Sequence, residues 1–170
     1  GTPDNGDVKE SDVIINITDG DSHYAERRFK INVENVPPSI TSSNALEVYQ
    51  DESYNNTYTT DETGGDITWT VASDADFLQM DPENGILHGT PDYSDVGIHE
   101  VNVTIHDGNG GMDSTIFDLE VIDINDAPWI ITENVLTATE DVYFEVDYEG
   151  EDLDGENLTW SMSTDADWLS

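Results

Sequence analysis

Apolar and polar residues alternate in short runs along most of the chain, and Gly, Asn, Asp and Pro separate these runs. A period of two residues is that of a β-strand with one buried face, whereas the period of an amphipathic helix is not found. The first two runs each carry their apolar residues on one face, at Val13, Ile15 and Ile17 and then at Phe29, Ile31 and Val33. The pattern therefore predicts an all-β protein.

The first pair of runs returns later in the chain. Val101, Val103 and Ile105 stand 88 residues after their counterparts, and Gly89-Thr90-Pro91 repeats Gly1-Thr2-Pro3 at the same distance. A second match joins the segment around Trp69 to that around Trp160, 91 residues further on. Matches at a fixed distance indicate tandem structural units of about 90 residues.

The repeat predicts three pieces. Residues 38–126 form one complete unit, residues 1–37 the C-terminal part of a preceding unit, and residues 127–170 the N-terminal part of a following unit. Trp69 and Phe77 are predicted to be core aromatics, and Pro82-Glu83-Asn84-Gly85 a tight turn. Seven strands are expected in the complete unit, near 46–49, 53–59, 67–72, 78–80, 85–88, 97–106 and 113–122, which suits a two-sheet sandwich.

The charge of the chain limits the classes of partner that it can bind. There are 39 Asp and Glu residues against 4 Lys and Arg, which gives a net charge of −35. Such a chain repels nucleic acid and anionic membrane surfaces, and we expect no membrane insertion in this segment. Bound cations or high salt would relieve the repulsion between the carboxylates. The absence of cysteine excludes disulfides and thiol chemistry.

The segment Asp123-Ile124-Asn125-Asp126-Ala127-Pro128 joins the complete unit to the next one. It offers three oxygen-bearing side chains within four residues, and such ligands suit a hard cation such as calcium. The alternative is an acidic loop that is closed by a proline.

Several motifs together resemble a known family. They are this linker, the run Gly-Ile-Leu-His-Gly-Thr-Pro-Asp at 85–92, the turn at Asp107-Gly108 and the segment Glu151-Asp152-Leu153-Asp154-Gly155. They resemble cadherin-like repeats of microbial surface proteins, of the dystroglycan-type cadherin-like and putative-Ig family. The resemblance implies tandem Ig-like, Greek-key β-sandwiches with Ca2+ held at the junctions between domains.

The resemblance also implies a set of calcium ligands. Asp123, Asn125 and Asp126 would supply the linker oxygens, and Asp152 and Asp154 would form the Asp-X-Asp pair of the following domain. Further ligands are expected from the preceding domain and from a neighbouring chain, at Glu52, Asp92, Asp95 and Asp19. The match is incomplete, because Ser94 stands where the family has Glu and Asp95 follows one position late.

The first linker, Glu34-Asn35-Val36-Pro37-Pro38, is shorter and lacks both linker aspartates. Thr63 also stands where Asp154 would be. This junction is therefore expected to hold no calcium.

The two incomplete units lead to a further prediction about association. Half a sandwich exposes an apolar face and unpaired strand edges, which favour association. Residues 127–170 of one chain and 1–36 of another would complete each other by strand exchange, as a dimer or a head-to-tail chain. The alternative is a fragment whose ends fray.

Three functions are compatible with these features. The first is a calcium-binding structural or adhesive module of a cell-surface or secreted protein, with itself, a surface polysaccharide or another adhesin as partner. The second is a carbohydrate-binding module, for which exposed aromatics are needed, and the third is a metal-free stalk. The candidate aromatics are Tyr54, Tyr58, Tyr93 and Tyr143. An enzyme is not expected, because no pair of carboxylates is diagnostic and the four histidines lack metal-ligand spacing.

Overall fold

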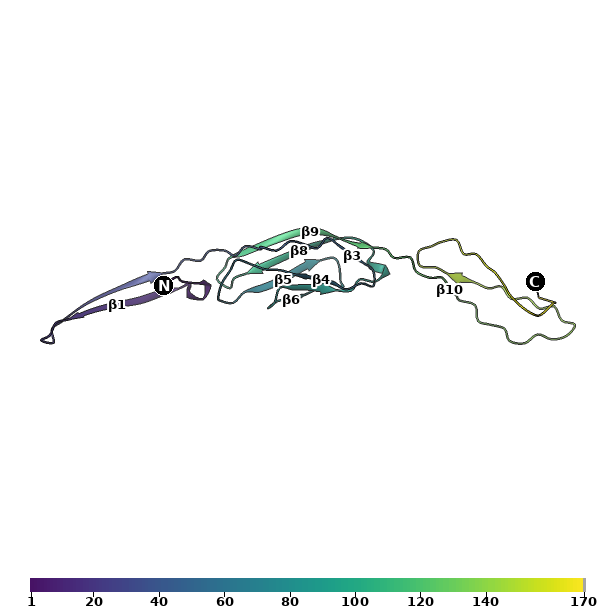
Figure 1. Cartoon of the computed structure of the whole chain (residues 1–170), viewed down its shortest axis with the longest axis horizontal. Coiled ribbons are helices and arrows are strands. Elements are labelled where there is room, and N and C mark those ends of the chain that lie inside the picture. Colours follow the sequence, from purple (N-terminus) through teal and green to yellow (C-terminus); the bar gives the residue numbers. More distant parts are fainter. Residues whose placement is uncertain (170) are drawn as a thin grey trace. The chain divides into compact units, whose positions relative to one another are not determined.

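The computed structural model describes residues 1–169, and it is nearly all β, with 38% strand and 4% helix (Figure 1). The chain divides into two compact units, Gly1–Asp123 and Ile124–Ser170. No helix in the described part of the chain is long and apolar enough to cross a membrane. The division into three domains at 37/38 and 126/127 stays a prediction.

The centre of the first unit is a sandwich of two sheets, as the strand pattern predicted. One sheet has the order β3 (Glu47–Tyr49), β9 (Met112–Ile122), β8 (Gly97–His106) and β5 (Thr68–Ser73). The other has the order β4 (Tyr54–Thr57), β7 (Ile86–Gly89) and β6 (Gln79–Asp81). The strands β3 and β9 run parallel, and the other neighbours are antiparallel. All seven strands lie within two residues of the predicted bounds.

The inward faces of the two sheets form the core. Val101, Val103 and Ile105 alternate along β8 and are fully buried, as the period of two residues requires. Trp69 is also buried, and Phe77 packs against the core, so both predictions for these aromatics are confirmed.

Tyr54 and Tyr58 belong to this core too, with 3% and 2% of their surface exposed. Their hydroxyl groups donate to the carbonyl of Ala45 and to Oδ1 of Asn44. Burial raises the pKa of both phenols. Neither ring can stack on a sugar, which leaves Tyr93 and Tyr143, 38% and 84% exposed, as the candidate aromatics.

The turn between β6 and β7 is confirmed. Asp81 accepts hydrogen bonds from the backbone of Glu83 and Asn84, and Gly85 follows with φ +65°. A Cβ at Gly85 would lie 2.9 Å from Nε1 of Trp69. Glycine is required here by its conformation and by the close approach of the indole ring.

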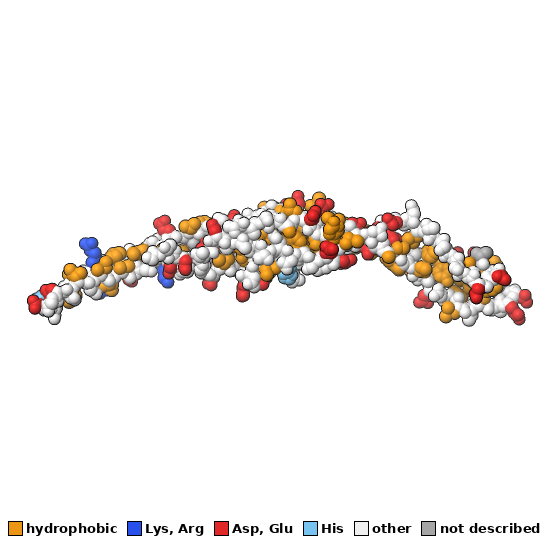
Figure 2. Space-filling model, in the orientation of Figure 1, with side chains coloured by type: hydrophobic (Ala, Val, Ile, Leu, Met, Phe, Trp, Pro, Cys, Tyr) orange, Lys and Arg blue, Asp and Glu red, His pale blue; other side chains and the backbone are white. Residues whose placement is uncertain are grey.

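A hairpin precedes the sandwich, formed by β1 (Glu10–Thr18) and β2 (Tyr24–Asn32), with a 3-10 turn at η1 (Asn5–Asp7). The hairpin is the counterpart of β8 and β9, but its apolar face is open. Ile15 is 51% exposed, whereas Val103 at the matching position is 0% exposed. Figure 2 shows hydrophobic side chains along the surface of this part of the chain.

The second unit contains one short antiparallel pair, β10 (Trp129–Ile130) and β11 (Gly150–Glu151). Its aromatic contacts repeat those of the sandwich. The ring centroids of Tyr58 and Trp69 are 5.8 Å apart, and those of Tyr148 and Trp160 are 6.5 Å apart. Trp160 is 50% exposed and Trp69 only 4%. The second unit therefore has the same aromatic pair, but its tryptophan ring is open to solvent.

Candidate metal centre

Three of the predicted ligand residues contact one another in the second unit. The backbone N–H of Asp126 donates to Oδ2 of Asp154 over 2.6 Å. The backbone N–H of Asp154 donates to Oδ1 of Asp152 over 3.0 Å, which closes a turn typical of Asp at this spacing. Gly155 continues this turn with φ +72°. The linker and the Asp-X-Asp motif are thereby joined.

The other carboxylate oxygen of Asp154 has no such partner. Its Oδ1 atom is buried and accepts no hydrogen bond within residues 1–169. The sequence from Ile124 onward contains 13 Asp and Glu and no Lys or Arg, so no basic side chain of this unit can neutralise it. A buried anionic oxygen without a donor is costly, and a hard cation would satisfy it. The residues present therefore fit calcium.

The other two linker residues are placed differently. The amide nitrogen of Asn125 donates to the carbonyl of Asp126 over 3.0 Å. Asp123 is exposed and ends the first unit.

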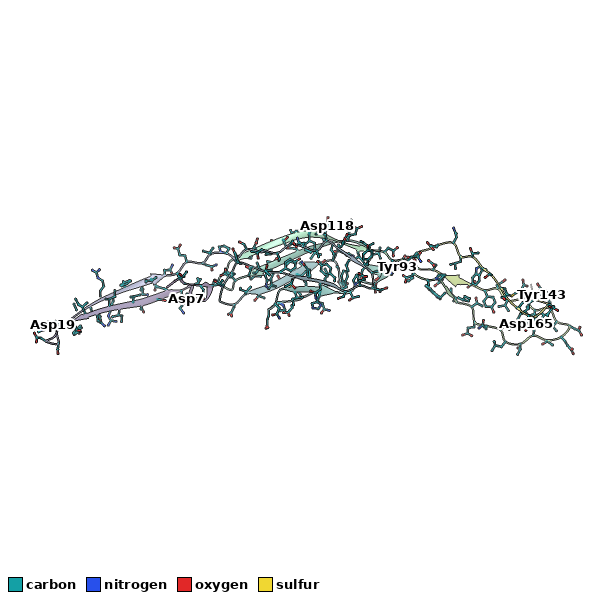
Figure 3. All side chains as sticks on the ribbon, in the orientation of Figure 1. Asp7, Asp19, Tyr93, Asp118, Tyr143 and Asp165 are labelled. Carbon is teal, nitrogen blue, oxygen red and sulfur yellow. The ribbon has the colours of Figure 1, made fainter. Side chains whose placement is uncertain are left out.

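The carboxylates predicted from the sandwich lie at one of its ends. The N–H of Gln50 donates to the carbonyl of Ile122, and the N–H of Asp51 donates to that of Pro91. These bonds hold the loop that contains Glu52 beside the end of β9 and beside the segment that begins at Asp92. Figure 3 labels Tyr93 at this end of the sandwich.

Asp92 and Asp95 cap the short 3-10 turn η2 (Tyr93–Asp95). Oδ1 of Asp92 accepts from the backbone N–H of Ser94 over 2.8 Å and from its hydroxyl over 2.6 Å. These bonds lower the pKa of Asp92, so the carboxylate is charged at neutral pH. Ser94 therefore has a structural role as a partner of Asp92.

Asp19 lies in the turn at the tip of the hairpin (Figure 3). Its Oδ1 accepts from the backbone of Asp21 and His23, and its Oδ2 lies 3.2 Å from Nδ1 of His23. The turn itself thus supplies these contacts. A role for Asp19 toward a neighbouring chain stays a prediction.

Among residues 1–169, no set of three or more His, Asp or Glu side chains converges into a preformed metal centre. The structure brings together Asp126, Asp152 and Asp154 in one unit. In the other unit it places Asp92 and Asp95 on the same turn.

A second polar cluster, not predicted from the sequence, lies at the first junction, where the linker at 34–38 meets the sandwich. Asp107 is 1% exposed, and its Oδ1 accepts from the backbone N–H groups of Asn109 and Gly111, each over 2.8 Å. Its Oδ2 accepts from Nδ2 of Asn35 over 2.7 Å. Burial alone would raise the pKa of Asp107, but these hydrogen bonds outweigh it and hold the pKa below its usual value.

Asn5 completes this cluster from the η1 turn and is 6% exposed. Its Nδ2 donates to the carbonyl of Asp107 over 2.8 Å, and its Oδ1 accepts from Nδ2 of Asn109 over 2.6 Å. One signal in the sequence could have located the η1 turn that holds Asn5. The pair Asp4 and Asp7 repeats Asp92 and Asp95 at the distance of 88 residues, and both pairs form a capping box.

Comparison with known proteins identifies the class of the sandwich. The family model described as Putative Ig domain matches residues 35–122, which is slightly more than half of the chain. The two-sheet fold and this match define an Ig-like domain. The chain belongs to the Putative Ig domain family, which confirms the resemblance found in the sequence.

Solved structures show similarity at low identity. Protocadherin Gamma B2 cadherin domains 1–5 are 15% identical, with a TM-score of 0.45 and coverage of 85% of this chain and 32% of that one. An endo-fucoidan hydrolase of glycoside hydrolase family 107 is 25% identical, with a TM-score of 0.43 and coverage of 73% and 20%. The SrpA adhesin of Streptococcus sanguinis is 13% identical, with a TM-score of 0.41 and coverage of 54% and 58%. The chain thus spans less than two thirds of each of these structures, and no curated protein matches it.

Proposed function

We propose that the chain is a calcium-binding structural or adhesive module, without catalytic activity, of a cell-surface or secreted protein. The buried Oδ1 of Asp154 carries this proposal, because it needs a positive partner and its unit has no basic residue. Calcium takes six to eight oxygen ligands in flexible geometry, which suits carboxylates on a turn and on a linker.

In this proposal the ion connects the linker to the Asp-X-Asp turn. Asp126, Asp152 and Asp154 would supply carboxylate oxygens, and Asn125 an amide oxygen. The ion would cancel the repulsion between these groups and restrict the rotation of the linker, which stiffens the polypeptide at this point. The ligand roles of Asp123, Glu52, Asp92, Asp95 and Asp19 stay predictions.

The first prediction is a calcium-dependent melting temperature. With a Kd of ~10⁻⁴ M, as for extracellular calcium modules, 10 mM calcium stabilises the bound state by about 2.7 kcal/mol relative to EDTA. We expect the pair of substitutions Asp152→Asn and Asp154→Asn to abolish this stabilisation. The measurement is calorimetric melting of the whole chain, with isothermal titration of calcium alongside.

The matched control is the pair Asp165→Asn and Asp167→Asn, which removes the same charge from exposed positions of the same unit. This variant is expected to keep the calcium response. Magnesium at equal concentration distinguishes specific binding from general screening of charge. Identical melting curves in EDTA and in calcium would overturn the proposal.

We also infer that the partner of the two open surfaces is a second copy of the chain. The repeat supports this choice, because the hairpin matches β8 and β9 and the second unit matches the strands around Trp69. The four basic residues, Lys9, Arg27, Arg28 and Lys30, all belong to the hairpin segment, where Figure 2 shows the blue side chains. The second unit carries only acidic residues. Arg28 and Lys30 already pair with Glu26 and Glu10 of the same hairpin, so the association would depend on the open apolar faces and not on charge.

The sandwich supplies the register of this pairing. In it, β5 and β8 pair Thr70 with Thr104. The matching residues of the two open surfaces are Ser161, 91 residues after Thr70, and Asn16, 88 residues before Thr104. We therefore expect Ser161 of one copy to lie opposite Asn16 of another.

The second prediction tests this register with cysteine pairs in a chain that has no cysteine of its own. Equal amounts of the single variants Asn16→Cys and Ser161→Cys are expected to form a disulfide-linked heterodimer under mild oxidation, because opposite residues on antiparallel strands approach within about 4.5–5.5 Å. Non-reducing electrophoresis and mass spectrometry identify the product.

The control replaces Asn16→Cys by Arg28→Cys, on the other hairpin strand and one strand further from the expected partner. This mixture is expected to give little heterodimer. Equal yields from the two mixtures, or a strict monomer in sedimentation at 100 µM, would contradict the pairing.

A further inference from the structure

The first linker has an amide where the second has a carboxylate. At the repeat distance of 91 residues, Asn35 and Pro37 of the first linker correspond to Asp126 and Pro128 of the second. The side chain of Asn35 turns toward the sandwich and donates to Oδ2 of Asp107 over 2.7 Å. The linker is thereby bonded to a carboxylate that is almost completely buried.

The carboxylate of Asp107 is well supplied with donors. Two backbone N–H groups bind Oδ1 and one side-chain amide binds Oδ2. An ionised carboxylate has about four lone-pair sites, so three are in use. The amide of Asn35 thus supplies the positive partner of Oδ2 that a cation would otherwise supply.

Close packing fixes this arrangement. A Cβ added at Gly111 would lie 2.2 Å from Oδ2 of Asp107 and 2.8 Å from Cα of Pro37. On the other side, Asn5 bonds the η1 turn to the carbonyl of Asp107, and its backbone N–H donates to the carbonyl of Thr63 over 3.1 Å. The residues before the hairpin, the linker after it and the loops of the sandwich thus form one hydrogen-bonded cluster.

We propose that amide donors take the place of a cation at this first junction, and that residue 35 decides whether the junction requires calcium. The inference goes beyond the proposed function, because it concerns another junction and holds whether or not the second unit binds calcium. The hairpin then stays joined to the sandwich at any calcium concentration. The chain would have one permanent joint and one that depends on the ion.

The third prediction concerns Asn35→Asp, a substitution of nearly unchanged shape. It replaces the donor by a second carboxylate facing Asp107, and two like charges at this distance repel each other. In EDTA at pH 7 we expect amide hydrogen exchange of residues 4–9 and 106–112 to become at least tenfold faster. Addition of 10 mM calcium is expected to restore most of the protection, because the carboxylate pair can bind the ion.

The measurement is hydrogen exchange by mass spectrometry on the whole chain. The variant is made in the Asp152→Asn and Asp154→Asn background, so that a response of the second junction cannot be mistaken for one of the first. Asn35→Ala is expected to exchange faster both with and without calcium, since it loses the donor and gains no charge. Asn55→Asp, the same change at an exposed position of β4, is expected to exchange like the parent.

Slow exchange of Asn35→Asp in EDTA would overturn the proposal, because it would mean that the amide holds nothing. A failure of calcium to slow exchange in this variant, or an equal response to calcium in Asn35→Ala, would show that residue 35 does not decide the need for an ion. None of these results depends on whether the parent chain binds calcium at the second junction.

Discussion

Replacing Trp69 by alanine will cost the central sandwich about 3–5 kcal/mol of its free energy of unfolding. The indole ring is buried, its centroid lies 5.8 Å from that of the tilted Tyr58 ring, and it borders Gly85, so its removal leaves a cavity that the two sheets cannot easily close. Urea unfolding followed by circular dichroism gives the loss as a lower midpoint at an unchanged slope.

The chain provides its own control at the repeat position. Trp160 has the same aromatic neighbour, Tyr148, but half of its surface is exposed. Trp160→Ala is therefore expected to cost only about 1 kcal/mol in dilute solution, since less apolar surface is lost from the interior. If copies complement each other, this cost will rise with protein concentration, whereas that of Trp69→Ala will not. Equal costs for the two substitutions would contradict the exposed fractions on which the proposed pairing of copies depends.

Asp107→Ala is expected to destabilise the first unit by about 3 kcal/mol. The substitution leaves the amide of Asn35 and the backbone N–H groups of Asn109 and Gly111 without their acceptor, and each unsatisfied buried donor costs about 1–3 kcal/mol. Part of this cost is relieved where water can enter. Chemical unfolding of the whole chain measures the difference, and Asp118→Ala, on the exposed face of β9, is the control, with little expected effect.

The same residue predicts a dependence on pH. Because the pKa of Asp107 is lower in the folded chain than in the unfolded one, the unfolded chain takes up the proton first on acidification. The stabilisation from Asp107 is therefore fully present above about pH 4, the ordinary range of the group, and is lost as pH falls through the folded pKa. Asp107→Asn removes this contribution, so its stability should fall less steeply than that of the parent below pH 4. Parallel curves would show that Asp107 is not the titrating group.

Much of the fold is visible in the sequence, because a period of two residues shows both that a strand is present and which face is buried. Val101, Val103 and Ile105 follow this rule, and their strand was predicted with its observed bounds. The same rule, applied to Tyr54 and Tyr58, places both rings on one face of a strand and excludes them as a binding platform. Both residues are in the core, as packing against a sheet requires.

The polar clusters are harder to predict, because they depend on contacts between distant residues. Asn5 and Asp107 are 102 positions apart in the sequence. The sequence of the first linker shows only that it lacks the two aspartates of the second linker. Whether the amide of Asn35 bonds to the carboxylate of Asp107 depends on which side of the first linker faces the sandwich. Similarly, the spacing of Asp152 and Asp154 suggests a ligand pair, but only the fold shows that one oxygen of Asp154 is left without a donor.

The parallel pairing of β3 with β9 has a mechanical consequence. The first of these strands follows the entry of the chain into the sandwich and the second precedes its exit, and the bonds from Glu120 to Leu46 and from Gln50 to Ile122 extend the pair at both ends. Tension applied through the two linkers pulls these strands past each other along their length. It therefore loads their hydrogen bonds together, in shear, and does not open them one at a time.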